Sequence, residues 1–239
     1  MTAPLQRPRN DPGQYDDLVA DWWEPRGRFA MLHWIAAARA RLIPPPQGAG
    51  SVLVDIACGG GLLAPHLAGS GHRHIGVDVS TTALEVARSR GVLAVRGNAL
   101  ALPLRDACAD VVVAGEILEH VTDLDAAVAE ACRVLRPGGT LVIDTIAATW
   151  WGRFSSITVG EKMPAGPPAR LHDGALFVDR DRLQRVAADH GVRLTLTGLR
   201  PAALDYARWL VRLRRDVRML STRSTAGLFQ AVGRKGTGA

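Results

Sequence analysis

One stretch decides the fold of this chain: Val52-Leu53-Val54-Asp55-Ile56-Ala57-Cys58-Gly59-Gly60-Gly61. A mostly apolar run leads into an acidic residue and a glycine-rich turn, and Leu62-Leu63-Ala64 then opens a helix. This order predicts a buried parallel strand, a tight turn and a helix N-terminus, and the glycines let the backbone come close to a ligand. A second acidic residue, Asp78, ends the next apolar run, and its carboxylate can accept hydrogen bonds from two ribose hydroxyls. The stretch therefore predicts an enzyme that binds a nucleoside-containing cofactor.

The spacing of the glycines separates two kinds of nucleoside cofactor. A dinucleotide site has the pattern G-x-G-x-x-G directly after the first strand, where the glycines seat a pyrophosphate. Here Ala57 takes the place of the first glycine, residues 59–61 are three glycines in a row, and Asp55 precedes the turn. A carboxylate at that point repels a phosphate and suits a cation, and S-adenosylmethionine carries a sulfonium and an ammonium group but no phosphate. The pattern favours S-adenosylmethionine over NAD, with a turn that is merely glycine-rich as the structural alternative.

Length and composition indicate a single folded domain. The chain has 239 residues with a hydrophobic content of 47%, which is enough for one α/β domain over residues 15–239. No apolar run reaches the roughly 20 residues that span a bilayer, and the N-terminus lacks the apolar core of a signal peptide. The three cysteines are an odd number without metal-binding spacing, which fits a reducing compartment. We therefore expect a cytoplasmic protein with a disordered start over residues 1–14.

Positive charge is concentrated late in the sequence. The formal net charge is +6 and the pI is about 10.0. One segment holds a crowd of arginines: Arg200, Arg208, Arg212, Arg214, Arg215, Arg218 and Arg223. Such a segment can bind nucleic acid, an anionic membrane surface or an acidic substrate, and it can also be a solvated helix face. The chain has no recognised nucleic-acid-binding motif and only 5% aromatic residues, so we expect no nucleic-acid partner.

Strands are expected to alternate with helices after an N-terminal helical extension over residues 15–43, which ends at a run of three prolines. We expect strands near residues 51–56, 74–78, 92–96, 110–115, 139–146, 192–199 and 226–232, and helices near 61–70, 80–90, 124–135 and 179–190. This alternation predicts an α/β, Rossmann-like fold with a mostly parallel seven-stranded sheet and helices on both faces. A turn is expected over residues 136–139, where the sequence is Arg-Pro-Gly-Gly.

Two segments depart from the alternation. Residues 150–173 are rich in proline and glycine and begin with two tryptophans, which indicates a lid or insertion over the substrate pocket. Residues 203–219 mix apolar and basic residues at helical spacing and predict a basic amphipathic helix. That helix could lie on a membrane or cover an apolar pocket, and a helix packed on the core with its arginines outward is the alternative.

Three further motifs make the chain resemble the class I S-adenosylmethionine-dependent methyltransferases, and among them the ubiquinone-biosynthesis O-methyltransferases. They are Trp22-Trp23-Glu24-Pro25-Arg26-Gly27-Arg28-Phe29 with Leu32-His33 and Arg39, then Glu116-Ile117-Leu118-Glu119-His120-Val121, and then Leu135-Arg136-Pro137-Gly138-Gly139. The glycine-rich turn and the Pro-Gly-Gly motif are shared by the whole superfamily, whereas the Trp-Trp and Leu-His segment indicates the narrower group. The resemblance covers roughly residues 15–200.

The resemblance implies roles for residues around the cofactor. Arg39 matches an arginine that contacts the cofactor, with a surface position on an amphipathic helix as its alternative. Asp78 matches the ribose-binding acid, and Asn98 and Ala99 match the positions near the adenine, although Asn98 can also be an ordinary turn residue. Together with the turn residues, the expected cofactor-binding set is Arg39, Asp55, Ala57, Gly59, Gly61, Asp78, Asn98, Ala99 and Gly115.

Glu116, Glu119 and His120 form a second candidate group, because spacings of three and four residues place side chains on one face of a helix. The resemblance associates these positions with a divalent metal, Mg²⁺ or Zn²⁺, which would lower the pKa of a catechol hydroxyl. In a second interpretation no metal is bound, and His120 is the general base with Glu119 beside it. In a third interpretation the group is structural.

These features predict an S-adenosylmethionine-dependent O-methyltransferase whose substrate is a small hydroxylated aromatic molecule: a phenol, a catechol or a prenylated quinone precursor. The oxygen acceptor rests on the resemblance. A nitrogen or carbon acceptor of a secondary metabolite is the alternative, followed by an RNA-modifying enzyme or a cofactor-binding regulator. Trp150, Trp151 and Phe154 suit a peripheral contact with the inner face of the membrane.

Overall fold

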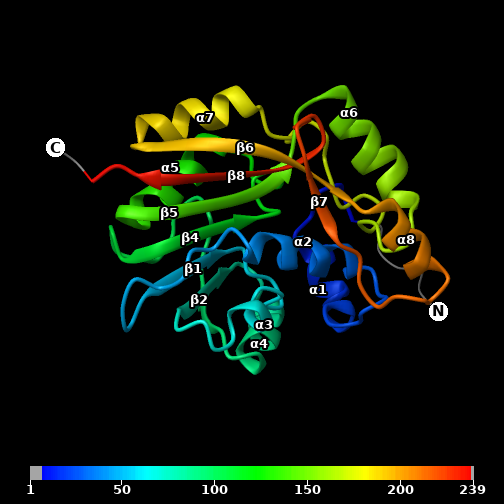
Figure 1. The fold of residues 1–239 in the computed structure, drawn as a ribbon, viewed down its shortest axis with the longest axis horizontal. Helices are drawn as coiled ribbons and strands as arrows, with labels where there is room; N and C mark the ends of the chain where they lie inside the picture. Colours follow the sequence, from blue (N-terminus) through cyan, green and yellow to red (C-terminus); the bar gives the residue numbers. More distant parts are fainter. Residues whose placement is uncertain (1–6, 238–239) are drawn as a thin grey trace.

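An eight-stranded sheet forms the centre of the molecule in a computed structural model that describes residues 7–237 (Figure 1). The strands lie in the order β3-β2-β1-β4-β5-β8-β6-β7, with β7 and β8 antiparallel to the others. Their bounds are β1 Val52–Ile56, β2 Arg73–Asp78, β3 Leu93–Arg96, β4 Ala109–Gly115, β5 Leu135–Ile146, β6 Val192–Pro201, β7 Met219–Thr222 and β8 Leu228–Lys235. The predicted Rossmann-like class is confirmed, and β7 is a strand that the sequence did not reveal.

Helices cover both faces of this sheet. The core on one face lies under α5 and α7, and on the other face the apolar side chains of β1, β4 and β5 meet α3 and the end of α2 (Figure 1). The helices are α1 Gly13–Asp17, η1 Val19–Asp21, α2 Ala30–Ala40, α3 Ala64–Leu67, α4 Thr81–Ser89, α5 Leu124–Val134, α6 Trp150–Arg153, η2 Phe154–Val159, η3 Gly160–Lys162, α7 Arg180–Asp189 and α8 Ala203–Leu210. Among residues 7–237, every helix is too short or too polar to cross a membrane.

The central strands are buried on both sides, which explains their near-continuous apolar sequences. Val112 and Val113 on β4 point to opposite faces and both are fully buried. Val54 of β1 pairs with Val112 in a parallel register. β-branched residues suit such strands because their stiff side chains pack well on a pleated surface.

The chain reverses its direction of travel across the sheet between β1 and β4. From β1 it moves outward through β2 to β3, and from β4 it moves the other way to β5. Neighbouring loops at such a point leave the sheet in opposite directions, so a crevice opens beyond the carboxyl ends of the strands. The fold therefore places a binding site at the ends of β1 and β4.

The N-terminal extension is shorter and more broken than the predicted helix over residues 15–43. It consists of α1, η1 and α2, and α2 stops at Ala40. Part of the expected disordered start, residues 1–6, lies outside the described residues. Residues 7–14 are held in place, because Arg7 pairs with Asp17 and α1 begins at Gly13.

The region around residues 136–139 forms the irregular start of β5. The register between β4 and β5 shifts between Ala109 and Val111, which is the signature of a bulge. Gly138 has a φ of 75°, a conformation that glycine adopts without strain. The predicted turn is thus a bulged continuation of a strand.

The predicted basic helix over residues 203–219 was wrong beyond Leu210. Arg212 adopts a φ of 63°, which ends helical geometry. The chain then turns back because the buried carboxylate of Asp205 accepts hydrogen bonds from Arg214 Nη1 at 3.1 Å and Arg218 Nε at 2.6 Å. Met219 therefore enters β7 beside β6, so the arginine-rich segment is a helix, a turn and a strand.

Residues 150–173 form an insertion between β5 and α7. Its first part is a run of short helices, α6, η2 and η3, and the rest is irregular. The hydroxyl of Tyr206 on α8 donates a hydrogen bond to the carbonyl of Pro164 at 2.8 Å, so the insertion and α8 are in contact. Whether this insertion moves as a lid stays a prediction.

Candidate active site

A cavity of about 290 Å³ lies at the carboxyl ends of β1, β2 and β4, where the sheet topology places a crevice. Its wall on the sheet side consists of the turns that follow the strands: residues 57–59, 77–80, 97–99 and 115–117. The N-terminal residues Asn10, Tyr15 and Trp22 close the opposite side. The site is therefore built from the sheet and from a segment at the start of the chain.

The glycine-rich turn after β1 has the left-handed backbone geometry that its sequence suggests. Gly59 and Gly61 have φ values of 51° and 78°, and Ala57 is also left-handed at 55°. The ring of Trp22 lies directly on the turn, because a Cβ added at Gly59 would come within 2.4 Å of it. The glycines thus allow a close approach of Trp22 as well as of a ligand. Ala57 adopts the left-handed conformation at an energetic cost, because it carries a Cβ.

Asp78 lies at the end of β2 and ties this turn to the next one. Its carboxylate accepts hydrogen bonds from the backbone N–H groups of Gly59 and Ser80, both at 2.9 Å. Burial raises the pKa of Asp78 against the lowering effect of these two bonds. The side chain is half-buried at the cavity wall, so it has further capacity to accept hydrogen bonds from a bound diol.

Asp55 is the buried acid at the end of β1. His74 Nε2 lies 3.2 Å from Asp55 Oδ2, and both side chains are buried. Asp55 also lines the cavity beside the glycine-rich turn. It is therefore placed where the sequence predicted a negative charge for a cationic ligand.

Arg39 on α2 is held by an acid that the sequence analysis did not single out. Its Nε and Nη2 donate to the two carboxylate oxygens of Asp144 on β5 at 2.5 and 2.6 Å, and both residues are buried. The guanidinium lies against the backbone of Gly115, where a Cβ would come within 1.9 Å of Arg39 Cζ. Nη1 makes no hydrogen bond within residues 7–237, so it is the nitrogen that can reach a ligand carboxylate.

Asn98 and Ala99 line the cavity at the end of β3, as predicted. The Asn98 side chain accepts a hydrogen bond from the Leu100 N–H at 2.9 Å, which closes an Asx turn. The alternative interpretation as a turn residue is therefore correct for the carbonyl end of this side chain.

Two acidic side chains follow β4 in a buried environment. Glu116 has a φ of 53°, and burial, together with the nearby Glu119 and Asp144 carboxylates, raises its pKa well above the usual value. Glu119 is fully buried and accepts a hydrogen bond from Thr145 Oγ1 at 2.7 Å. Burial raises the pKa of Glu119 to about 7. Burial therefore favours the neutral form of Glu116, and Glu119 is the acid whose pKa lies near neutral pH.

His120 lies at the cavity wall with a partner at each ring nitrogen. Nδ1 is 2.5 Å from Asn10 Oδ1, and Nε2 is 3.3 Å from the Tyr15 hydroxyl. The ring stacks on His172 with a centroid distance of 5.1 Å. Burial lowers the pKa of His120 to about 3 and that of His172 to about 4, so both imidazoles are neutral at pH 7.

The predicted metal ligands do not converge. Within residues 7–237, the group whose ligand atoms all lie within 4.8 Å of one another is Glu119, His120 and His172, without Glu116. Glu119 Oε1 and His172 Nδ1 are buried without hydrogen-bond partners in this range, which would suit a ligand. Both ring nitrogens of His120, however, have hydrogen-bond partners, Nδ1 with Asn10 Oδ1 and Nε2 with the Tyr15 hydroxyl, so neither is available to an ion. As arranged, this donor set does not fit Mg²⁺ or Zn²⁺.

Comparison with known proteins gives a family for this geometry. A family model described as "Methyltransferase domain" matches residues 54–143, which run from β1 through the glycine-rich turn to β5. The ubiquinone biosynthesis O-methyltransferase of Methylococcus capsulatus is 34% identical over 181 residues, covering 72% of this chain and 76% of the relative. The corresponding enzyme of Thiobacillus denitrificans is 32% identical over 197 residues, covering 78% of this chain and 84% of the relative.

The chain belongs to the class I S-adenosylmethionine-dependent methyltransferases, in the family of these relatives.

Solved structures agree at the level of the fold. A Thermotoga maritima S-adenosylmethionine-dependent methyltransferase, described as a possible histamine N-methyltransferase, matches with a TM-score of 0.65 at 23% identity, over 93% of this chain and 96% of that one. The [4+2]-cyclase SpnF matches with a TM-score of 0.59 at 18% identity, over 98% of both chains. These two proteins of the same fold differ in the activities that their names describe, so the methyl acceptor of this chain has to be inferred from its site.

S-adenosylmethionine fits the residues of this methyltransferase. Asp78 offers a carboxylate for ribose hydroxyls, Asp55 offers negative charge near the turn, and Arg39 Nη1 can meet the amino-acid carboxylate. The lack of a side chain at Gly59 and Gly115 makes room at the cavity wall for Trp22 and for the guanidinium of Arg39. All nine predicted cofactor-binding residues lie in one region, and eight of them line the cavity; Gly61 packs instead against Ala87 and Val92.

Four residues of the methyltransferase site were missed by the sequence analysis: Asn10, Tyr15, Asp144 and His172. Asp144 gave a signal, because it is an acid within an otherwise apolar strand that has to be buried. Asn10 and Tyr15 lie in or next to the segment expected to be disordered, and His172 lies in the insertion. Their places depend on contacts between distant parts of the chain, which spacing alone does not give.

Replacing Asp78 with alanine should weaken the binding of S-adenosylmethionine and S-adenosylhomocysteine by about 1–3 kcal/mol, because ribose hydroxyls and two backbone N–H groups lose their acceptor. Titration calorimetry on the purified methyltransferase measures this loss. Asp189→Ala, an exposed acid at the end of α7, is the matched control and should bind normally. Equal affinities for the wild type and Asp78→Ala would contradict the assignment, as would tighter binding of NAD than of either ligand.

Proposed function

We propose that this methyltransferase transfers a methyl group to a hydroxyl of a small aromatic acceptor: a phenol, a catechol or a prenylated quinone precursor. The observation that carries the proposal is the contact between the phenolic hydroxyl of Tyr15 and His120 Nε2, at 3.3 Å on the cavity wall. A phenol oxygen can therefore occupy hydrogen-bonding distance of the imidazole inside the cofactor cavity. The names of the two relatives, both ubiquinone biosynthesis O-methyltransferases, support the same acceptor class.

The protein's own task in this reaction is to align the acceptor and to handle one proton. S-adenosylmethionine supplies an activated methyl group on its sulfonium. His120 is neutral at pH 7, so Nε2 carries a lone pair that can accept the hydroxyl proton as the oxygen–carbon bond forms; burial, which lowers the pKa of His120 to about 3, makes it a weaker base. Glu119 places a carboxylate oxygen within 4.8 Å of a His120 ring nitrogen, and in its ionised form it stabilises the imidazolium that results.

A direct assay tests the acceptor class. The protein is incubated with S-adenosylmethionine labelled in its methyl group and with matched panels of phenols, prenylated catechols, aromatic amines, carbon acids and total RNA. Mass spectrometry of the products should find the label on a hydroxyl oxygen. Label confined to nitrogen, carbon or RNA would overturn the oxygen proposal and favour one of the alternative methyltransferases, and binding of cofactor without any transfer would favour a regulator.

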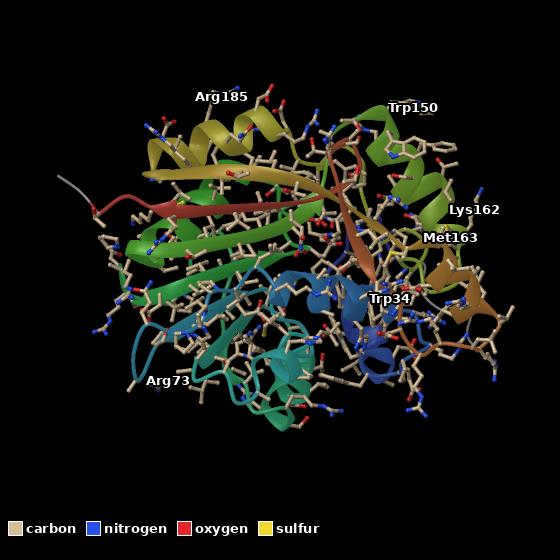
Figure 2. The ribbon with its side chains drawn as sticks, in the orientation of Figure 1. Trp34, Arg73, Trp150, Lys162, Met163 and Arg185 are labelled. Carbon is tan, nitrogen blue, oxygen red and sulfur yellow. The ribbon has the colours of Figure 1, made fainter. Side chains whose placement is uncertain are left out.

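We also propose that one end of the molecule makes a peripheral contact with the inner face of an anionic membrane. Exposed apolar side chains on the insertion and around α8, which lie at the same end (Figure 1), form what we term the apolar edge: Trp150, Trp151, Val159, Leu204, Leu210, Val211 and Leu213. Trp150 is 72% exposed and lies at the outer margin of the molecule (Figure 2). Exposed arginines at positions 208, 212 and 215 add the positive charge that an anionic surface attracts.

Vesicle flotation tests this contact. The wild type should float with vesicles of phosphatidylglycerol and phosphatidylcholine, and Trp150→Ser with Trp151→Ser should reduce the bound fraction, because tryptophan side chains anchor at the lipid interface. Leu93→Ser, an exposed apolar residue on the distant β3, is the control. Equal binding by the wild type and the double variant would contradict the proposed surface.

A further inference from the structure

Asn10 holds His120 at two points. Asn10 Nδ2 donates a hydrogen bond to the backbone carbonyl of His120 at 2.9 Å, while Asn10 Oδ1 lies 2.5 Å from the ring nitrogen Nδ1 of the same residue. One amide group therefore spans the main chain and the ring of a residue 110 positions away. This arrangement fixes the direction of the imidazole as well as its location.

The hydrogen bond to the carbonyl determines which atoms carry protons. A carbonyl oxygen only accepts, so the amide nitrogen of Asn10 has to face the His120 carbonyl, and rotating the amide by half a turn would set two acceptors against each other. Asn10 Oδ1 then faces His120 Nδ1, and because that oxygen also only accepts, Nδ1 has to carry the hydrogen. In the neutral ring, Nε2 is left with its lone pair directed at the Tyr15 hydroxyl.

We propose that Asn10 is a positioning residue that fixes the proton of His120 on Nδ1 and so presents Nε2 to the acceptor hydroxyl as a proton acceptor. This inference rests on the proposed role of His120 as the base. The Tyr15 hydroxyl donates to Nε2 and occupies the place that an acceptor hydroxyl would take, so the Tyr15 side chain has to turn aside while Asn10 keeps its hold on the ring.

The backbone around Asn10 supports a specific function for this residue. Asn10 has a φ of 59°, a left-handed conformation that persists where the surroundings determine it strongly. Its own N–H donates to the Arg170 carbonyl at 3.2 Å. Arg9 Nη1 donates to Glu161 Oε1 at 3.0 Å and to the His172 carbonyl at 2.9 Å. The start of the chain is thus fastened to the insertion on both sides of the amide that holds His120.

Two substitutions separate positioning from folding. Asn10→Gly removes the amide and keeps the left-handed backbone. Asn10→Asp tolerates the same φ and keeps an oxygen that accepts from Nδ1–H, but it loses the N–H donor to the His120 carbonyl. Asn10→Gly should lower kcat on the phenolic acceptor by about 10- to 100-fold, less than complete loss of the base, because the productive tautomer stays accessible. Asn10→Asp should have a kcat clearly above that of Asn10→Gly, because it keeps the acceptor for Nδ1–H, and the Kd for S-adenosylhomocysteine should stay within about twofold in both variants.

Nitrogen-15 NMR of the histidine side chains supplies a readout that does not depend on turnover. Wild-type His120 should show a protonated Nδ1 and an unprotonated Nε2, and Asn10→Gly should shift the ring towards the other tautomer. The control is Gln14→Ala, which removes hydrogen bonds to the Pro8 and Arg170 carbonyls but does not touch His120; it should change neither the tautomer nor kcat.

The outcomes separate this inference from the proposed function. A wild-type ring protonated on Nε2, an unchanged tautomer or kcat in Asn10→Gly, or a kcat in Asn10→Asp no higher than in Asn10→Gly would each overturn the role of Asn10. Full activity of a His120→Ala variant would instead overturn the proposed role of His120 itself.

Discussion

Replacing His120 with alanine should lower kcat by about 10²–10⁴-fold, the usual contribution of a general base, and should leave the affinity for S-adenosylhomocysteine nearly unchanged. The reason is geometric, since Nε2 of His120 faces Tyr15 on the N-terminal side of the cavity, whereas most of the predicted cofactor-binding residues lie on the turns after β1 to β3. Steady-state kinetics with a phenolic acceptor and calorimetry with the cofactor product measure the two effects separately.

A chelator gives the control for this substitution. If the protein's own side chains handle the proton, EDTA should leave wild-type turnover intact, and His190→Ala, an exposed histidine after α7, should also be fully active. Loss of turnover in EDTA that Mg²⁺ or Zn²⁺ restores would instead reinstate a metal, held by Glu119, His120 and His172 after their rings rotate. Full turnover by His120→Ala would leave the group as structural.

The pH dependence of the reaction should report on Glu119. Because burial raises its pKa to about 7, Glu119 is neutral below that pH and a carboxylate above it, where it can stabilise the imidazolium. The wild-type kcat should therefore increase as the pH rises from about 6 to about 8 and then level off. Glu119→Gln, which keeps the shape but not the charge, should have a lower kcat without this step, and an unchanged profile would contradict the role.

Replacing Asp144 with alanine should lower the free energy of unfolding by about 3–5 kcal/mol, because the guanidinium of Arg39 would remain buried without its partner. Urea unfolding followed by circular dichroism measures this change. This loss of stability is the cost of leaving Arg39 buried without its partner. The net contribution of the intact pair to stability is smaller, since both charges lose their hydration when they are buried. The double variant Arg39→Met with Asp144→Leu should therefore recover much of the stability.

An exposed ion pair provides the matched control. Arg133 Nη1 lies 2.6 Å from Asp106 Oδ1, but the Asp106 side chain is 78% exposed, so Asp106→Ala should cost less than about 1 kcal/mol. If Asp144→Ala lowered the free energy of unfolding as little as Asp106→Ala does, another acidic side chain would have to pair with Arg39. Glu116 is the candidate, because its pKa is held up partly by Asp144.

The parts of the fold that could be predicted are those encoded by short segments. The strands β1, β2 and β4 are mostly apolar, and the acids near the ends of β1 and β2 and the glycines after β1 mark the end of the sheet at which the cavity lies. Most residues predicted to bind the cofactor line one cavity for the same reason, since they lie within a few positions of a strand end; their contact with the cofactor stays a prediction.

The rest of the site depends on contacts that short segments do not determine. Arg39 was expected to contact the cofactor, but two of its three guanidinium nitrogens are bound by Asp144, 105 residues further along the chain. The predicted basic helix was too long, because the periodicity of apolar and basic residues continues past Leu210. In the structure the chain turns back after the helix, since the Asp205 carboxylate accepts hydrogen bonds from Arg214 and Arg218. In both cases a buried carboxylate decides the local structure.

Because Asn10 and Tyr15 contact His120, the orientation of this base depends on the N-terminal segment lying over the cavity. Any displacement of the segment around Asn10 breaks both hydrogen bonds of the amide to His120, and it also withdraws Tyr15 from the wall of the cavity. If the N-terminal segment moved away from the cavity, the His120 ring would lose its fixed orientation and water would enter the site. The sulfonium would be protected from wasteful attack by water, because the base is aligned only while that segment excludes solvent.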